Sequence, residues 1–350
     1  MATSIFLSFI FIVQLFNIFL TCNSLPKFSS ILVFGDSLVD TGNNNFLPLS
    51  VLKANHYPYG ESFPGGIATG RFSDGKLMSD FLAEALGLKQ TVPPFTDPNL
   101  PQSELPTGVC FASAGSGYDD TTSETQVIPV TQQYQTHFKS YKQRLIGMVG
   151  ELNAKNILQN SLVFSVAGSN DVALNYYANP AAIYFHGTMD EYQNALIDNI
   201  QTFIKSLYED GCRNMAIAGL PPVCNPLDLG GLIGCLFNKG SDANVYNTKL
   251  QAMLTELQPT LPGSKLVYAD IFTPMEELAL NPFLHGIQYP IGPGCCGNGL
   301  FPRMGPTCDI YAPLCGNPSN HFFWDAVHPT QTVYRYMSDY LITNVLPQFN

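Results

Sequence analysis

The chain has 350 residues and a formal net charge of −11 at pH 7, although only 12% of its residues are charged. A pI near 4.8 and the lack of any cluster of Lys and Arg argue against nucleic-acid binding, because that binding depends on cations that neutralise phosphates. The length suits one large domain, and the acidic balance suits a protein dissolved in an acidic extracellular fluid.

The first 24 residues predict a secretory signal peptide. They contain no Lys, Arg, Asp or Glu, the stretch Ile5 to Leu20 is almost wholly apolar, and small or polar residues from Thr21 to Ser24 follow. A retained membrane anchor is the alternative, but the apolar run is shorter than the roughly 20 residues that a spanning helix needs. No later segment is apolar enough to cross a bilayer, so we expect no stable membrane insertion. Residues 25–350 are expected to form a single domain.

Five short apolar runs predict strands. Successive residues in each run are apolar, without alternation, which is typical of strands covered on both faces of a sheet. Longer segments between the runs place apolar residues at helical spacing. Alternating strands and helices indicate an α/β protein with a parallel sheet and helices on both sides. The predicted strands are Ile31–Phe34, Gly108–Ala112, Ser161–Ala167, Met215–Leu220 and Lys265–Asp270, and the predicted helices are Lys76–Leu86, Thr131–Met148, Asp190–Tyr208, Ala243–Leu257 and Gln331–Val345.

Residues that can carry chemistry follow the first three predicted strands. Ser37 comes after the first, Gly115 after the second and Gly168–Asp171 after the third, while Asp325 and His328 lie just before the last predicted helix. Ligands of open parallel sheets bind at the carboxyl ends of the strands. We therefore expect these residues to meet at one edge of the sheet.

Ser37, His328 and Asp325 have the chemistry of a nucleophile, a base and an orienting carboxylate. A serine hydroxyl is a poor nucleophile until a base takes its proton, and an imidazole does this well when a carboxylate fixes its tautomer and orientation. Asp325 stands three residues before His328, so one local segment supplies both groups. Taken alone, this motif also fits a helix start, with Asp325 near the helix dipole and Pro329 in the first turn. The joint occurrence of the motifs at strand ends favours catalysis.

Four sequence blocks, in this order, resemble the GDSL, or SGNH, hydrolase family, and within it the plant extracellular esterase/lipase branch. The resemblance runs from about Ser30 to the C-terminus. It implies a flavodoxin-like, three-layer α/β/α fold with a five-stranded parallel sheet. The blocks are Phe34–Asn45, Val109–Asp119, Gly168–Asp171 and Phe323–Pro329, and the segments Gly70–Lys76 and Cys295–Gly297 also look like this branch.

The resemblance implies a role for each site residue. Ser37 would be the nucleophile, His328 the general base and then acid, and Asp325 the residue that orients His328. The oxyanion hole would consist of the backbone N–H groups of Ser37 and Gly115 and the side-chain amide of Asn170. Such an amide donates without titrating, and each prearranged donor contributes roughly 10²–10³ in rate. The family needs no metal and no organic cofactor.

The nine cysteines occur in different contexts along the chain. Cys22 lies in the predicted signal peptide, and the other eight form an even set in a chain bound for an oxidising compartment. Cys295, Cys296, Cys308 and Cys315 crowd into one loop, where disulfides are favoured over a metal because adjacent cysteines seldom form a zinc site. Their connectivity stays open.

Two positions depart from the pattern of the family. Cys110 stands where the family usually has Asn, and we expect it to support the Gly115 loop from behind. In the segment Leu220–Cys224, the cysteine stands about one place away from its usual position in this branch of the family. The shift would alter a disulfide between Cys224 and Cys235.

For two segments in or near the first block, the sequence allows two interpretations each. Asn43–Asn45 is expected to be the rim of a turn, with lining of an acyl or alcohol site as the alternative. The aromatic residues Tyr57, Tyr59 and Phe63 are equally consistent with a core and with a substrate wall.

The sequence thus predicts a secreted carboxylic ester hydrolase that works through an acyl-serine intermediate. Its substrate would be a small-molecule or lipid ester, its location the cell wall or apoplast, and its state a monomer. An acyltransferase that uses the same acyl-enzyme and a non-catalytic lipid-binding protein are the alternatives. An ordinary α/β-hydrolase is disfavoured, since no serine has glycines at both flanking positions of the nucleophile elbow.

Overall fold

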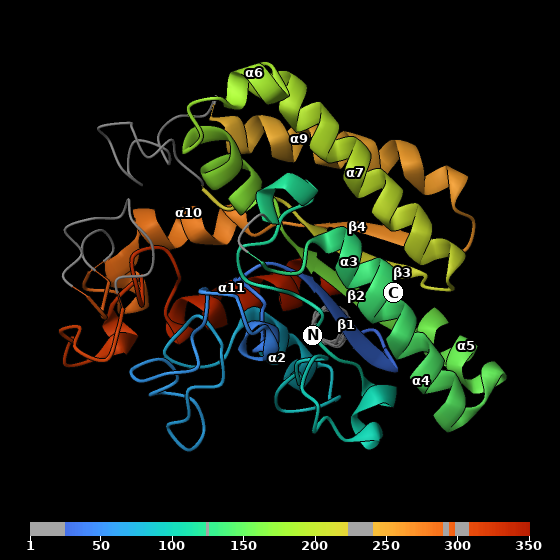
Figure 1. Ribbon diagram of the computed structural model, residues 1–350, viewed down its shortest axis with the longest axis horizontal. Coiled ribbons are helices and arrows are strands. Elements are labelled where there is room, and N and C mark those ends of the chain that lie inside the picture. The colour runs from blue at the N-terminus through green and yellow to red at the C-terminus, as the bar shows by residue number, and fades with distance from the viewer. Residues whose placement is uncertain (1–24, 124–125, 223–240, 290–293, 298–307) are drawn as a thin grey trace, which may run out of the picture.

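The computed structural model describes residues 25–123, 126–222, 241–289, 294–297 and 308–350 (Figure 1). The predicted signal peptide, Cys224 and Cys235 lie outside these ranges. None of the described helices is long and apolar enough to cross a membrane.

The centre of the molecule is a parallel sheet of four strands in the order β1-β2-β3-β4. Every residue of β1 and β2 is buried, which explains why these segments are apolar at successive positions. The register pairs Leu32 with Val163 and Val163 with Met215. The strands are β1 (Ser30–Gly35), β2 (Ser161–Val166), β3 (Asn214–Ala218) and β4 (Lys265–Ala269).

The prediction of a fifth strand at Gly108–Ala112 is wrong. The segment lies beside β1, and Val33 exchanges backbone hydrogen bonds with Val109 and Phe111, but only Cys110 forms β-bridges. On its other side Cys110 meets Pro93 and Pro94. A proline has no N–H to donate, so the pairing cannot extend into a ladder on that side.

Helices cover both faces of the sheet, in agreement with the predicted three-layer α/β/α class (Figure 1). On one face lie α4, α5, α7 and α9, and on the other lie α2, α10 and α11. The helix α7 begins at a capping box, in which Thr188 and Glu191 satisfy each other's backbone N–H. The bounds are α2 (Met78–Ala85), α3 (Val130–Gln132), α4 (Lys139–Val149), α5 (Glu151–Gln159), α6 (Ala182–His186), α7 (Met189–Glu209), α9 (Asp242–Leu257), α10 (Phe272–Leu280) and α11 (Gln331–Asn344).

The five predicted helices are all present, with one change of detail. The predicted helix Thr131–Met148 is divided: α3 is followed by a π-helical segment, Gln133–Phe138, and then by α4. A second π-helical segment, Asp171–Tyr177, follows β2. Such segments are rare and frequently occur at functional sites.

The core consists of one apolar cluster on each face of the sheet. Alternate residues of a strand point to opposite faces, so Leu32 and Phe34 of β1 enter one cluster while Ile31 and Val33 enter the other. A third, smaller cluster surrounds Trp324 beside the sheet. This third cluster includes the residue before Asp325 and so forms part of the surroundings of the candidate site.

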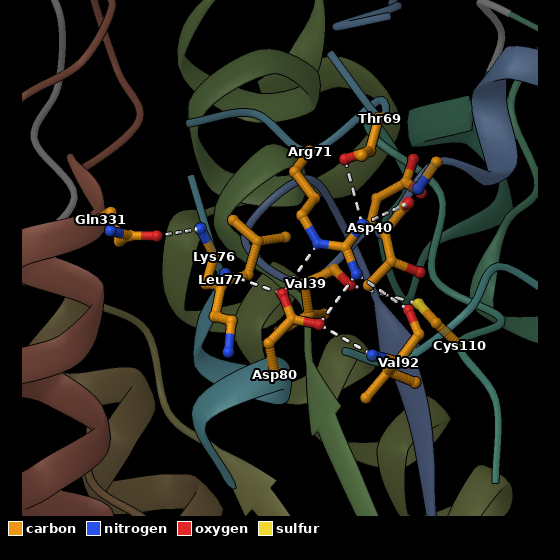
Figure 2. Close-up of polar contacts among 12 residues, drawn as sticks. Val39, Asp40, Thr69, Arg71, Lys76, Leu77, Asp80, Val92, Cys110 and Gln331 are labelled. Atoms are coloured by element: carbon orange, nitrogen blue, oxygen red, sulfur yellow. Dashed lines mark hydrogen bonds and ion pairs between the residues drawn. The ribbon is translucent and has the colours of Figure 1, made fainter. Parts of the chain in front are cut away.

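A buried ion pair holds the loop after β1 against α2 (Figure 2). The Nε and Nη2 atoms of Arg71 donate to the two carboxylate oxygens of Asp80 at 2.7 and 2.8 Å, and the two side chains are 4% and 0% exposed. The guanidinium also donates to Thr69 Oγ1 and to the carbonyl oxygens of Thr41 and Val92. All of its N–H groups therefore have acceptors, and the pair fixes Thr41, four residues beyond Ser37.

Asp80→Asn is expected to lower the free energy of unfolding by about 3–5 kcal/mol, because it leaves the buried Arg71 charge uncompensated. Chemical denaturation measures the change. The matched control is Asp190→Asn, which removes the partner of Lys249 at the surface, where ion pairs contribute little. Equal effects of the two substitutions would contradict the importance of the buried pair.

Candidate active site

Ser37 lies in a turn directly after β1, and the backbone before it is tightly held. Gly35 has a φ of +134°, and a Cβ at this position would lie 1.8 Å from the carbonyl oxygen of Val166, so only glycine fits. The Gln133 carboxamide donates to the Gly35 carbonyl and accepts from its N–H, each at 2.8 Å. Gln133 is completely buried. It therefore fixes the end of β1 and the start of the Ser37 turn.

The Gly115 loop is held by side chains from the block that contains Ser37. Asp40 accepts from the N–H of Ala114 at 2.9 Å. Asn43 donates to the carbonyl oxygens of Cys110 and Ala112, and Asn44 donates to that of Ala114. Asn45 is half-buried, whereas Asn43 and Asn44 are 0% and 1% exposed, so the expectation of a turn rim is wrong at these two positions. They shape the loop from inside instead.

Cys110 touches the same block from behind the loop. Its thiol donates to the carbonyl oxygen of Val39 at 3.2 Å (Figure 2). This contact is the one expected of a residue that supports the loop. Gly115 itself has a φ of +86°, in the region that favours glycine.

Two backbone donors at this place have no acceptor. Within the described ranges, neither the N–H of Ser37 nor that of Gly115 makes a hydrogen bond, although Gly115 is buried. Buried N–H groups without partners are rare in proteins. The two donors are thus available to an oxygen atom of a bound molecule.

Asn170 joins this loop from the exit of β2. It precedes the π-helical segment Asp171–Tyr177, and its Nδ2 donates to the carbonyl oxygen of Ser116 at 2.9 Å. A carboxamide nitrogen carries two hydrogen atoms, so this bond leaves the second one available. The bond also ties Asn170 to the residue that follows Gly115.

Asp325 and His328 are in direct contact. The Nδ1 atom of His328 lies 2.8 Å from Oδ2 and 3.0 Å from Oδ1 of Asp325. Oδ1 also accepts from the N–H groups of Val327 and His328. Asp325 is 0% exposed and His328 is 7% exposed, so the pair is shielded while the imidazole reaches the surface.

The electrostatics keep Asp325 ionised. Its complete burial acts to raise its pKa, but the charge of His328, the hydrogen bond from it and the two backbone N–H groups outweigh burial, and the pKa of Asp325 lies below the ordinary value. The carboxylate can therefore hold the His328 Nδ1–H and leave the other ring nitrogen, Nε2, free to accept a proton.

The two ends of the chain meet through the segment that precedes α2. The Phe72 ring packs 4.9 Å from the His328 ring. Ser73 donates to the carbonyl oxygen of Pro329, and the side chain of Gln331 accepts from the N–H of Lys76 at 2.7 Å (Figure 2). These contacts bring the segment of Asp325 and His328 to the loops that follow β1.

Asp36, the residue before Ser37, is close enough to His328 to interact with it electrostatically. Burial raises the pKa of Asp36, and the charge of His328 acts in the opposite direction. Among the described residues, however, no hydrogen bond joins the Ser37 hydroxyl to His328. Catalytic hydrogen bonds are often long before a substrate binds.

Three buried aspartates surround the loops of the site. Burial raises the pKa of Asp36 to about 7, that of Asp40 to about 6 and that of Asp171 to about 7, although backbone N–H groups bonded to each act against it. Asp36 uses one oxygen to accept from Leu38 N–H, and its Oδ2 has no partner in the described part of the chain. An unpartnered buried oxygen costs less on a neutral acid than on a carboxylate.

The sequence did not predict the contact of Tyr59 with Asp325. Tyr59 is 2% exposed, and its hydroxyl donates to Asp325 Oδ2 at 2.8 Å. The two residues are 266 positions apart, so no spacing rule connects them. The sequence left open whether Tyr59 belongs to the core or to a substrate wall. The ring is part of the core, and the hydroxyl makes a hydrogen bond to Asp325.

The four cysteines of the loop form disulfides, as predicted. Cys295 pairs with Cys315 and Cys296 with Cys308. Cys110 and Cys212 are buried free thiols, so the even count of eight does not translate into four disulfides. The sulfurs of Cys295 and Cys315 lie within 4.8 Å of a His321 nitrogen, but a disulfide has no thiolate to offer a metal.

Comparison with known proteins gives the family of this three-layer α/β protein. The family model described as GDSL-like Lipase/Acylhydrolase matches residues 31–341. The chain belongs to this family, as the four sequence blocks predicted. It is a carboxylic ester hydrolase, and its substrates are small-molecule esters as a class.

Several plant relatives cover nearly the whole chain. The Arabidopsis thaliana protein GDSL esterase/lipase At2g30220 is 43% identical over 323 residues, which are 90% of this chain and 89% of the relative. GDSL esterase/lipase At1g58430, from the same plant, is 43% identical and covers 91% and 90%. A solved structure, "BT4096 a gut microbial diltiazem-metabolizing enzyme", is 14% identical with a TM-score of 0.35 and covers 91% of this chain and 47% of that chain, which is too low a likeness to inform fold or function.

The raised pKa values of Asp36, Asp40 and Asp171 predict that the protein loses stability as the pH rises. Between the ordinary value of 3.8 and the raised values of about 6 to 7, the folded protein binds more protons than the unfolded chain. The free energy of unfolding therefore falls as pH rises through this window. Chemical denaturation at several pH values between about 5 and 8 measures the slope.

Asp36→Asn is the matched variant for this experiment. The amide oxygen of Asn can accept from Leu38 N–H, and its NH₂ group occupies the place of the unpartnered Oδ2. The variant is permanently neutral, so it should show a shallower slope and a gain in stability above about pH 7 relative to the natural protein. A slope identical to that of the natural protein would remove Asp36 from the explanation.

Proposed function

We propose that this esterase acts through an acyl-serine intermediate, with Ser37 as nucleophile, His328 as general base and then acid, and Asp325 as the residue that orients His328. The observation that carries the proposal is the contact of His328 Nδ1 with a fully buried, ionised Asp325. It leaves Nε2 as the nitrogen that can take a proton. The position of Ser37 at the end of β1 is that of ligand-binding loops in parallel sheets.

The reaction has two steps. The Ser37 Oγ attacks the ester carbonyl carbon while its proton passes to His328 Nε2, and that proton is then given to the leaving alkoxide, which departs as an alcohol. Water then attacks the acyl-serine carbonyl carbon while its proton passes to His328 Nε2. As the bond from the acyl carbon to Ser37 Oγ breaks, His328 returns this proton to Oγ, so that the acid is released and the serine is restored. Asp325 stabilises the imidazolium in both steps.

Three donors support the negative charge that forms on the carbonyl oxygen. They are the unpartnered N–H groups of Ser37 and Gly115 and the second amide hydrogen of Asn170. Donors fixed before the reaction stabilise the charge without having to reorient, which makes this term a large one in acyl transfer. The hydrogen bond from Asn170 to the Ser116 carbonyl ties the Asn170 amide to the loop that carries the Gly115 N–H.

The proposal includes the setting of the enzyme. Residues 1–24 would be removed as a signal peptide, and residues 25–350 would act as a single domain in the cell wall or apoplast. The two disulfides support an oxidising compartment. Exposed apolar side chains such as Ile183, Tyr184 and Phe185, in the short helix α6, support a lipid or otherwise apolar ester.

Ser37→Ala should abolish turnover of a short-chain chromogenic ester, because the variant lacks the hydroxyl that would form the acyl-enzyme. A fluorophosphonate probe should label the natural protein at Ser37, as peptide mass spectrometry can show. Ser79→Ala is the control, since its hydroxyl is buried in α2 without a partner in the described structure. Full activity in Ser37→Ala would disprove the assignment.

Asn170→Ala should lower kcat by about 10²-fold or more, with a much smaller change in KM, because the lost donor acts mainly in the transition state. Asn175→Ala, on the π-helical segment that follows Asn170, removes amide contacts to Asp119 and Thr122 instead. That control should keep kcat within a small factor of the natural value. A rise in KM alone for Asn170→Ala would indicate ground-state binding rather than an oxyanion hole.

A further inference from the structure

Tyr59 and His328 donate to the same oxygen atom. The hydroxyl of Tyr59 and the Nδ1 of His328 each lie 2.8 Å from Asp325 Oδ2. The other oxygen, Oδ1, accepts from the backbone N–H groups of Val327 and His328. In the described structure, therefore, Tyr59 is the one side chain other than His328 that donates to Asp325.

Tyr59 stays a donor throughout the pH range in which the protein works. Burial raises its pKa far above the ordinary value, and the charge of Asp325 adds to the effect. Its ring is fixed from three sides by edge contacts with His56, Phe72 and Trp324, at centroid distances of 5.3, 5.9 and 6.3 Å. The hydroxyl is thus held in place and cannot follow a carboxylate that turns away.

A donor on a shared oxygen changes what that oxygen does for its other partner. A hydrogen bond from Tyr59 draws negative charge away from Oδ2, so Asp325 stabilises the imidazolium form of His328 less strongly. The same bond prevents rotation of the carboxylate about its bond to Cβ, which would break the bidentate contact with His328.

We propose that Tyr59 is a positioning residue of the esterase, which fixes the Asp325 carboxylate and moderates its attraction for the His328 proton. The inference rests on the proposed function of Ser37, Asp325 and His328. It adds that the Tyr59 hydroxyl, which shares Asp325 Oδ2 with His328, weakens the hold of this carboxylate on the imidazolium form.

The other titratable groups around the pair are few. Asp36 interacts electrostatically with His328, Tyr334 interacts with Asp325 and with Tyr59, and the ring of His56 packs on Tyr59. The hydroxyl of Tyr334 is buried without a partner among the described residues and makes no bond to Asp325. The experiment therefore changes the hydroxyl of Tyr59 and leaves these groups in place.

The test is the pH dependence of kcat/KM in Tyr59→Phe, measured with a soluble short-chain ester. Without the donor, Asp325 holds the imidazolium more strongly, so the acidic limb of the profile should move up by roughly 0.5–1 pH unit. At the optimum, kcat should fall by about 3- to 10-fold, because the carboxylate is less well fixed.

Tyr141→Phe is the matched control. Tyr141 is 0% exposed and donates to the carbonyl oxygen of Leu105 at 2.8 Å, far from Asp325 in the fold. It also loses one buried hydroxyl and one hydrogen bond, so its melting temperature should fall as that of Tyr59→Phe does, but its acidic limb should not move.

Replacement of Tyr59 alone by 3-fluorotyrosine keeps the ring and makes the hydroxyl a stronger donor, so the acidic limb should move down. This second variant decides the matter if Tyr59→Phe does not fold. An acidic limb that is unmoved in a folded variant of either kind would overturn the proposal and leave Tyr59 as a core residue. Activity in Ser37→Ala would instead refute the proposed function, so the two failures are distinguishable.

Discussion

A negative charge in a fully buried place is the constraint on which the site depends. Burial alone would neutralise Asp325, and a neutral acid would hold neither the tautomer nor the orientation of His328. The charge persists because donors reach it from two distant parts of the chain, Tyr59 from the loops after β1 and Val327 and His328 from the final loop. The geometry of the site is thus also the means by which the fold tolerates the charge.

The loops at the carboxyl edge of the sheet are shaped by buried polar side chains rather than by regular structure. Gln133 fixes the end of β1, Asp40 and the two asparagines fix the Gly115 loop, and Arg71 with Asp80 fixes the segment between them. A buried polar network of this kind stabilises one arrangement strongly when all its members are satisfied. It holds these loops in place without the help of a strand or helix.

The sequence predicted the class of fold well, because strands buried on both faces must be apolar throughout and such runs are visible. It did not predict the strand count, since the run at Gly108–Ala112 looks like the others and only its neighbours Pro93 and Pro94 limit its pairing. Asp325 and His328 were recognisable because they are three residues apart and contact each other locally.

Contacts between distant segments were beyond the reach of the sequence. Tyr59 meets Asp325 across 266 positions, and Gln133 meets Gly35 across 98, so neither leaves a periodic signal. From sequence alone, a polar residue such as Asn43 is expected at the surface. Burial of an amide is favourable only where carbonyl groups are placed to accept its hydrogen bonds. That placement is a property of the folded chain alone.

The two disulfides have a consequence for where this enzyme can be made. The N–H groups of Cys295 and Cys296 donate to the carbonyl oxygens of Phe323 and Trp324, so the crosslinked loop braces the stretch of backbone that leads into Asp325. Without the two crosslinks, the loop would hold this stretch of backbone less firmly. The braced form of this segment therefore exists only where the four cysteines can be oxidised.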